Sequence, residues 1–274
     1  MRNRRITLLV LIAVTCLALL EGRLGIIPYN RGTGITITGW DEFIPHAVVE
    51  KECLLPASDL TQLVIDAEAA RVTVSGAETD SIQILATVHA AASTVEKVEE
   101  DLAGFKIDAI VEGETAILRA KMPSEMPKIG TFRIVYQVTV PQDLFISAVV
   151  QQGLLELSDL SGGIDLDAEY SGSSANNLSG GITGDIRYGS IELKRVEGPV
   201  DLQTVSSAVE LVLVDVPAGY TFDIEAAYGT IDSTIGLERK EDNALITAKG
   251  VLREGEYPVT VRSRFSTVEI SLER

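Results

Sequence analysis

The chain has 274 residues, 46% of them hydrophobic, which is enough for one large or two ordinary domains with a real core and argues against a disordered chain. Its 40 acidic and 23 basic residues give a formal net charge of -17. A folded surface of that sign repels phosphate backbones and anionic headgroups, so we expect a soluble, self-repelling surface and no nucleic-acid partner. An acidic surface that binds cations or basic ligands is the alternative.

The N-terminus differs from everything that follows it. Three arginines in MRNRR precede fifteen apolar or near-apolar residues at 6–20, and Glu21 and Arg23 end the run. This order is typical of a secretory signal, and the run is shorter than the roughly 20 residues that span a bilayer as a helix. We interpret residues 1–22 as a signal peptide or an uncleaved N-terminal membrane anchor. In either case the rest of the chain is extracytoplasmic, secreted or membrane-anchored, and contacts the membrane through its N-terminal segment only.

Residues 23–55 contain glycines, two prolines and a few aromatic residues, without a sustained period. We interpret them as a spacer with one or two short strands. Cys53 is the only thiol beyond the leader, so no internal disulfide can form there and the fold must be held by its core and backbone pairing. We expect Cys53 to be a partly buried small apolar residue.

From about residue 60 onward, short alternating runs are separated by Gly, Ser, Asn and Asp, which predicts strands. In the run at 132–140, Phe132, Ile134, Tyr136, Val138 and Val140 share one face. Arg133, Gln137 and Thr139 lie on the other. Strands are predicted at 72–76, 81–90, 106–111, 116–122 and 132–140.

One segment, at 93–104, has a helical pattern instead. Ser93 stands three residues before Glu96, as in a capping box, and Gly104 ends the run. Val95, Val98 and Leu102 would form one apolar stripe. The sequence therefore predicts a helix of about ten residues, which we interpret as a lid packed on the sheet; a docking helix is the alternative.

A repeat of 18 residues runs from about 142 to 213. Each copy holds about two short strands and two turns, too little to bury a face alone, so the copies must stack. If each copy is one coil, equivalent residues lie about 4.8 Å apart along an axis, and glycines recur where the backbone turns. An antiparallel meander would give similar alternation but would not require the same phase in every copy. The aligned positions are Leu160, Leu178 and Val196; Gly162, Gly180 and Gly198; and Ile164, Ile182 and Val200.

One copy is weak, and a looser echo of the repeat continues to the end of the chain. Ser173 and Ala175 stand where the next copy has Ile191 and Leu193, so this coil must pinch in, hold water or open a groove. An aromatic residue, two small residues, a β-branched residue and an acid recur in YGSIE, YGTID and FSTVE, which begin at Tyr188, Tyr228 and Phe265. We interpret these aromatics as core or edge packing, and a binding surface is the alternative.

These motifs resemble the putative-adhesin family of bacterial envelope proteins, a β-strand-repeat domain of unknown function. The resemblance covers about residues 60–274. It depends on the order of VIDAEAARVTVSG, STVEKVEEDLAG, VTVPQDLFISA, the LSGG and VEGP repeats, AAYGTIDS and RSRFSTVEISLE. It implies an elongated β-structure in the cell envelope with a structural or adhesive role, and it brings no catalytic residues with it.

The sequence contains no established catalytic, cofactor-binding or metal-ligating motif. His46 lies in the spacer. His89 shares a predicted strand face with Gln83 and Thr87, so we expect it to be solvated. Neither histidine has a cysteine or second histidine at ligand spacing. We predict no catalytic, cofactor or metal site residues and no cofactor.

Two readings of the acidic residues remain open as alternatives. Asp165, Asp167 and Asp185 could be the carboxylates of a β-helix enzyme acting on polysaccharide, although Asp165 and Asp167 alternate with apolar residues as on an ordinary outward face. GGIDLD and GGITGD are near misses of the calcium-binding nine-residue repeat, with its fourth-position glycine missing.

We therefore expect an all-β fold, a β-solenoid or elongated β-helix-like stack of short strands with one short helix, preceded by an N-terminal hydrophobic helix. Its parts would be the leader at 1–22, the spacer at 23–55 and a β-strand-repeat domain at 56–274. The expected function is a noncatalytic, adhesin-like binding or scaffolding module of the cell envelope with an unidentified envelope or surface ligand. A membrane-tethered regulatory or sensory domain and a polysaccharide-acting enzyme are the alternatives.

Overall fold

The computed structural model describes residues 36–37, 46–91, 96, 102, 105–121 and 131–273. All of these belong to one compact unit, which spans 34–274. The leader at 1–22, and with it the predicted hydrophobic helix, lies outside the described residues. Within the described part of the chain, no helix is long and apolar enough to cross a membrane.

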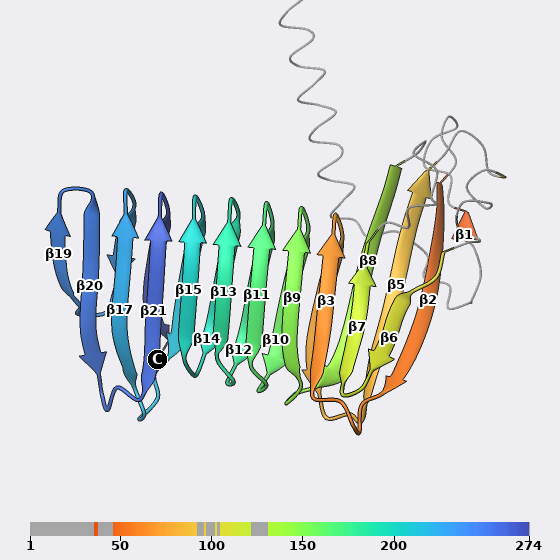
Figure 1. Ribbon diagram of the computed structural model, residues 1–274, viewed down its shortest axis with the longest axis horizontal. Coiled ribbons are helices and arrows are strands. Elements are labelled where there is room, and N and C mark those ends of the chain that lie inside the picture. Colours follow the sequence, from red (N-terminus) through yellow and green to blue (C-terminus); the bar gives the residue numbers. More distant parts are fainter. Residues whose placement is uncertain are drawn as a thin grey trace, which may run out of the picture. The chain divides into compact units, whose positions relative to one another are not determined.

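The described residues form two open sheets of eleven strands each, seen one behind the other in Figure 1. Sheet 1 has the order β1 (Thr36–Ile37), β2 (His46–Pro56), β5 (Ser81–Ala91), β8 (Thr131–Pro141), β4 (Arg71–Ala77), β10 (Leu154–Leu160), β12 (Gly172–Leu178), β14 (Ser190–Val196), β16 (Ala208–Val214), β22 (Thr267–Glu273) and β18 (Thr230–Ser233). Sheet 2 has the order β19 (Glu238–Asp242), β20 (Leu245–Leu252), β17 (Tyr220–Ala227), β21 (Tyr257–Arg264), β15 (Val200–Val205), β13 (Ile182–Arg187), β11 (Ile164–Glu169), β9 (Phe145–Gln151), β3 (Gln62–Glu68), β7 (Thr115–Ala120) and β6 (Asp108–Glu112).

The alternating sequence pattern produces this architecture because successive side chains of a strand point to opposite faces. In β11, Ile164, Leu166 and Ala168 are buried, whereas Asp165 and Asp167 are exposed. The buried faces of both sheets contribute to a single hydrophobic cluster. The described residues are thus nearly all β, as predicted.

The 18-residue repeat sets the register of the middle strands. β11, β13 and β15 pair in parallel, and Ile164, Ile182 and Val200 are Cα partners in that order. β10, β12, β14 and β16 pair in the same way in sheet 1. Each copy contributes one strand to each sheet, so the predicted stacking of equivalent repeat residues is observed in this region.

The order of strands beyond the repeat differs from the order in the chain. β21 pairs with β15, and β17 pairs with the other edge of β21, although β17 comes first in the sequence. The looser repeat expected near the C-terminus therefore forms strands of the same stack, but these strands are not stacked in the order of the chain. Antiparallel pairs, such as β2 with β5 and β17 with β20, also make both sheets mixed, which is less regular than a uniform solenoid.

Residues 46–56, most of which were interpreted as spacer, form β2. This strand pairs antiparallel with β5 from His46 to Pro56. Cys53 is a free, partly buried cysteine packed against the core, as expected. The compact unit thus begins upstream of residue 56.

The strands predicted at 72–76, 81–90, 106–111, 116–122 and 132–140 correspond to β4, β5, β6, β7 and β8. Of the last, Ile134, Tyr136, Val138 and Val140 are buried, as the alternation predicts. The predicted helix at 93–104 lies mostly outside the described residues. Glu96 and Leu102 are described, both with helical backbone; Glu96 is exposed and Leu102 is fully buried.

The weak copy keeps its place in the stack. Ser173 and Ala175 are Cα partners of Ile191 and Leu193 and are 6% and 4% exposed. The Ser173 hydroxyl has no hydrogen-bond partner among the described protein groups. The repeat therefore continues through this copy with smaller side chains and one unsatisfied buried hydroxyl.

Candidate functional site

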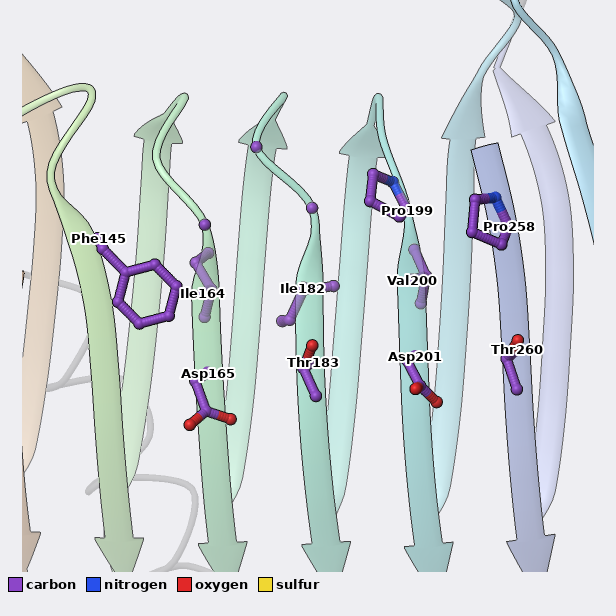
Figure 2. Close-up of a pocket in the computed structure, with 13 residues that line it drawn as sticks. Phe145, Ile164, Asp165, Ile182, Thr183, Pro199, Val200, Asp201, Pro258 and Thr260 are labelled. Atoms are coloured by element: carbon purple, nitrogen blue, oxygen red, sulfur yellow. The ribbon is translucent and has the colours of Figure 1, made fainter. Parts of the chain in front are cut away.

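A hollow of about 490 Å³ lies on the outer face of sheet 2, over β9, β11, β13, β15 and β21. Figure 2 shows the Phe145 ring on one side, the prolines Pro199 and Pro258 on the other, and a row of polar side chains below them. It is an open depression on five neighbouring strands.

The hollow exists because glycine stands just before two of these strands, whereas large residues take the aligned positions of the neighbouring strands. One residue directly precedes the aligned core residue of each strand, and in strand order these residues are Phe145, Gly163, Gly181, Pro199 and Pro258. Backbone hydrogen bonds from Ile164 N to Gly181 O and from Ile182 N to Pro199 O, at 3.2 and 2.9 Å, continue the alignment to this row.

Both glycines lie in close contact with a neighbouring side chain, and Gly181 also has a backbone conformation that favours glycine. A Cβ on Gly163 would lie 3.0 Å from Cε2 of Phe145, so the aromatic ring packs directly on the glycine backbone. Gly181 has a φ of +82°, and a Cβ there would lie 2.8 Å from Cγ of Pro199. Any larger residue would have to shift its neighbour and, at 181, adopt an unfavourable backbone conformation.

The polar row below the glycines contains two carboxylates. Asp165, Thr183, Asp201 and Thr260 are aligned Cα partners on β11, β13, β15 and β21. Two strand spacings separate Asp165 from Asp201, or about 9.6 Å between Cα atoms. Within the described part of the chain, neither carboxylate has a hydrogen bond or an ion pair.

The acidic residues next to the hollow are arranged differently. Arg187 Nη2 lies 2.7 Å from Oδ1 of Asp167, and its Nε lies 3.4 Å from Oδ1 of Asp185. The hydrogen bond from Arg187 to Asp167, together with the charges of both aspartates, raises the pKa of the guanidinium. Two of the three carboxylates singled out from the sequence thus share one arginine. The third, Asp165, faces the hollow with Asp201, which the sequence reading did not single out.

A second exposed feature is a row of aromatic side chains at one corner of the stack, which we call the corner ladder. It comprises Tyr170, Tyr188, Phe265 and Tyr228, which have φ values of 51–56° and are 50–64% exposed. Tyr170 stacks on Tyr188 with ring centroids 5.0 Å apart, and Tyr228 stacks on Phe265 at 5.2 Å. The expected edge packing is therefore observed, but these rings are not part of the core.

The ring faces within each pair of the corner ladder are largely occupied by each other. Ser206, which has a φ of 52°, takes the same position in the copy after Tyr188. A small residue is thus compatible with this corner, and the ladder consists of two separate stacked pairs. We therefore treat the hollow as the better candidate site.

The histidine singled out from the sequence lies away from the hollow. His89 is exposed on β5 with Gln83 on the same face, as predicted. Partial desolvation and the nearby Arg133 charge lower its pKa. His46 lies at the start of β2, and its side chain is outside the described residues.

No group of three or more His, Cys, Asp or Glu side chains that could hold a metal ion occurs among the described residues. The near-miss calcium motifs at 162–167 and 180–185 place their aspartates on β11 and β13. There, Asp167 and Asp185 contact Arg187.

Comparisons with known proteins find distant structural similarity. A putative cell adhesion protein from Clostridium sporogenes has a TM-score of 0.43 and 11% sequence identity, covering 82% of this chain and 100% of that chain. A putative adhesin from Parabacteroides merdae has a TM-score of 0.28 and 10% identity, covering 82% of this chain and 96% of that chain. No family model and no curated protein matches the sequence. Likeness at this level does not carry a functional argument.

Proposed function

We propose that this chain is a noncatalytic, extracytoplasmic β-solenoid that serves the cell envelope as a binding or scaffolding module. The observation that carries the proposal is the hollow, an open site built from the outward face of five aligned strands. Residues far apart in the chain, such as Phe145 and Pro258, line one surface because their strands are held in register. A stack of this kind presents side chains on a stiff, extended face, which suits binding better than turnover.

The solenoid description is supported by the parallel register of successive repeat copies. Strands β9, β11, β13 and β15 pair with one another in sheet 2. Strands β10, β12, β14 and β16 pair with one another in sheet 1. Each copy then forms one coil of two strands. β3 and β4 extend this stack at one end, and β21 and β22 extend it at the other. The antiparallel strands are then terminal additions to the solenoid.

The extracytoplasmic location is supported by the basic and apolar leader at 1–22, which has the order of a secretory signal. Expression of the full chain with a C-terminal tag in a bacterial host tests it. Protease added to intact spheroplasts should remove the tag while a cytoplasmic marker survives. Protection of both would contradict the proposed location.

The noncatalytic character is supported by the arrangement of the acidic residues. Asp167 and Asp185 are paired with Arg187, and Asp165 lies two strands away from Asp201 in an open depression.

The competing proposal, an enzyme acting on envelope polysaccharide, is tested directly. Asp165, Asp167 and Asp185 are replaced together by Asn, and hydrolysis of cell-wall glycans is measured for the variant and the parent. We expect no turnover by either protein. Turnover by the parent that the triple variant loses would refute the noncatalytic proposal.

A further inference from the structure

We propose that the hollow on sheet 2 binds a basic peptide segment whose lysine or arginine side chains reach Asp165 and Asp201. This inference depends on the proposed binding function and names the ligand class of the same site. The sequence analysis interpreted Asp165 as part of an ordinary outward face, with a catalytic carboxylate as the alternative, and did not single out Asp201.

The first argument is charge complementarity. Asp165 and Asp201 face the hollow without a cation of their own, whereas Arg187 lies between the neighbouring Asp167 and Asp185. The net charge of -17 adds an attractive field for any cationic ligand. A ligand with positive groups of its own would form ion pairs with Asp165 and Asp201, as Arg187 does with the neighbouring Asp167 and Asp185.

The walls of the hollow suit the apolar part of a basic side chain. Phe145 is 39% exposed, and its ring borders the two-glycine gap. Pro199 and Pro258 border the gap from the other side. The methylene stem of lysine or arginine packs favourably on such surfaces, and an aromatic face within about 6 Å also attracts the cation itself.

The spacing of the two carboxylates favours a peptide over a single small cation. The two carboxylates come from strands that are two spacings apart, with Cα atoms about 9.6 Å apart, so a ligand with two separate positive groups fits them better than a single cation does. Two residues at positions i and i+2 of an extended peptide point to the same side and lie about 6.6 Å apart, within reach of both aspartates through long basic side chains. Neutral glycans would bring hydroxyl groups but no compensating charge.

The experiment uses the full-length chain and titrates it with an eight-residue peptide in which two lysines are separated by one residue. The same peptide with both lysines acetylated and a neutral cell-wall oligosaccharide are the comparison ligands. Binding is measured by calorimetry at low and physiological salt. We expect the lysine peptide to bind with a strong salt dependence and the acetylated peptide to bind at least about tenfold more weakly.

Two variants separate a local site from the general field of the protein. The double variant Asp165→Asn/Asp201→Asn removes both carboxylates of the hollow. The double variant Glu210→Gln/Glu269→Gln removes the same charge from aligned exposed positions on sheet 1. We expect at least about tenfold weaker binding for the first and less than about twofold for the second. Thr183→Lys places a cation between the two aspartates and should compete with the peptide.

Equal effects of the two double variants would overturn the proposal, because binding would then come from the overall field. So would equal binding of the acetylated peptide, or no binding of the lysine peptide at low salt. Binding of the neutral oligosaccharide, lost with Thr183→Lys, would assign the hollow to a glycan and leave the proposed binding function in place. Turnover of the glycan would instead refute the proposed noncatalytic function.

Discussion

The weak repeat copy offers a sharp test of how the core is built. Ser173 lies in β12 at 6% exposure, aligned with Ile191, and its hydroxyl has no partner among the described groups. A buried hydroxyl without a hydrogen bond costs about 1–3 kcal/mol. Ser173→Ala removes that hydroxyl, so we expect the free energy of unfolding to rise by about 1–3 kcal/mol.

Ser263 provides a matched control. It lies in β21 at the same 6% exposure, but its hydroxyl donates a hydrogen bond to the carbonyl oxygen of Glu225 at 3.1 Å. Ser263→Ala should therefore lower the free energy of unfolding by about 0.5–1.5 kcal/mol. The small volume lost and the change in strand propensity are the same in both variants, so the two should differ by at least about 1.5 kcal/mol.

Urea unfolding of the parent and both variants measures this difference, provided that the slopes with denaturant agree. Thermal unfolding gives a second measure, since each kcal/mol shifts the Tm of a large domain by about 2–4 °C. If Ser173→Ala destabilises the protein as much as Ser263→Ala does, the reasoning is refuted. The Ser173 hydroxyl would then have a partner, such as a bound water molecule.

Three further predictions test the hollow, the corner ladder and an ion-pair cluster. Gly181→Ala should lower the free energy of unfolding by about 1–3 kcal/mol because of the positive φ and the contact with Pro199. The control Gly236→Ala, with no heavy atom within 4 Å of the new Cβ, should change it by less than about 0.5 kcal/mol. Equal urea midpoints for the two variants would contradict this prediction. Tyr188→Ser should cost about 0.5–1.5 kcal/mol through loss of the stack on Tyr170 while the fold is kept, as Ser206 occupies the same position; a change in the circular dichroism spectrum would argue against it. Hydrogen bonds from Lys249 and Arg262 lower the pKa of Asp223 from its usual 3.8, so its ionised form stabilises the fold above that pH and the stabilisation is lost as the pH falls through the lower folded-state pKa. Asp223→Asn should therefore be less stable than the parent at pH 7, and the gap should narrow below pH 3.8; a gap independent of pH would show that the charge is not responsible.

The sequence predicted the middle of the fold better than its ends. Ile164, Ile182 and Val200 share a phase in the repeat, and this phase is preserved as parallel register. The spacer was expected to hold one or two short strands, but the position and the eleven-residue length of β2 were not predicted, because HAVVEKECLLP shows no clear alternation. It becomes a strand through pairing with β5, and pairing with a partner distant in sequence leaves no local signal.

The hollow could be predicted only in part. The glycine pairs in LSGG were interpreted as turn residues, which they are, since each precedes a strand of sheet 2. That they also leave a gap depends on Phe145, Pro199 and Pro258 occupying the aligned positions. Pro258 lies outside the repeat, so only the pairing of β15 with β21 places it there.

By itself, the sequence determined that the described part of the chain is nearly all β, which of its residues face the core and how the repeat copies align. It could do so because side-chain alternation and the 18-residue phase are local properties, set by backbone geometry and hydrophobic burial. Only the tertiary structure decided that β21 pairs with both β15 and β17, and that Asp165 and Asp201 face one hollow while Asp167 and Asp185 share Arg187. Those outcomes depend on which strand edges are free when distant segments meet, and no local pattern of residues records that choice.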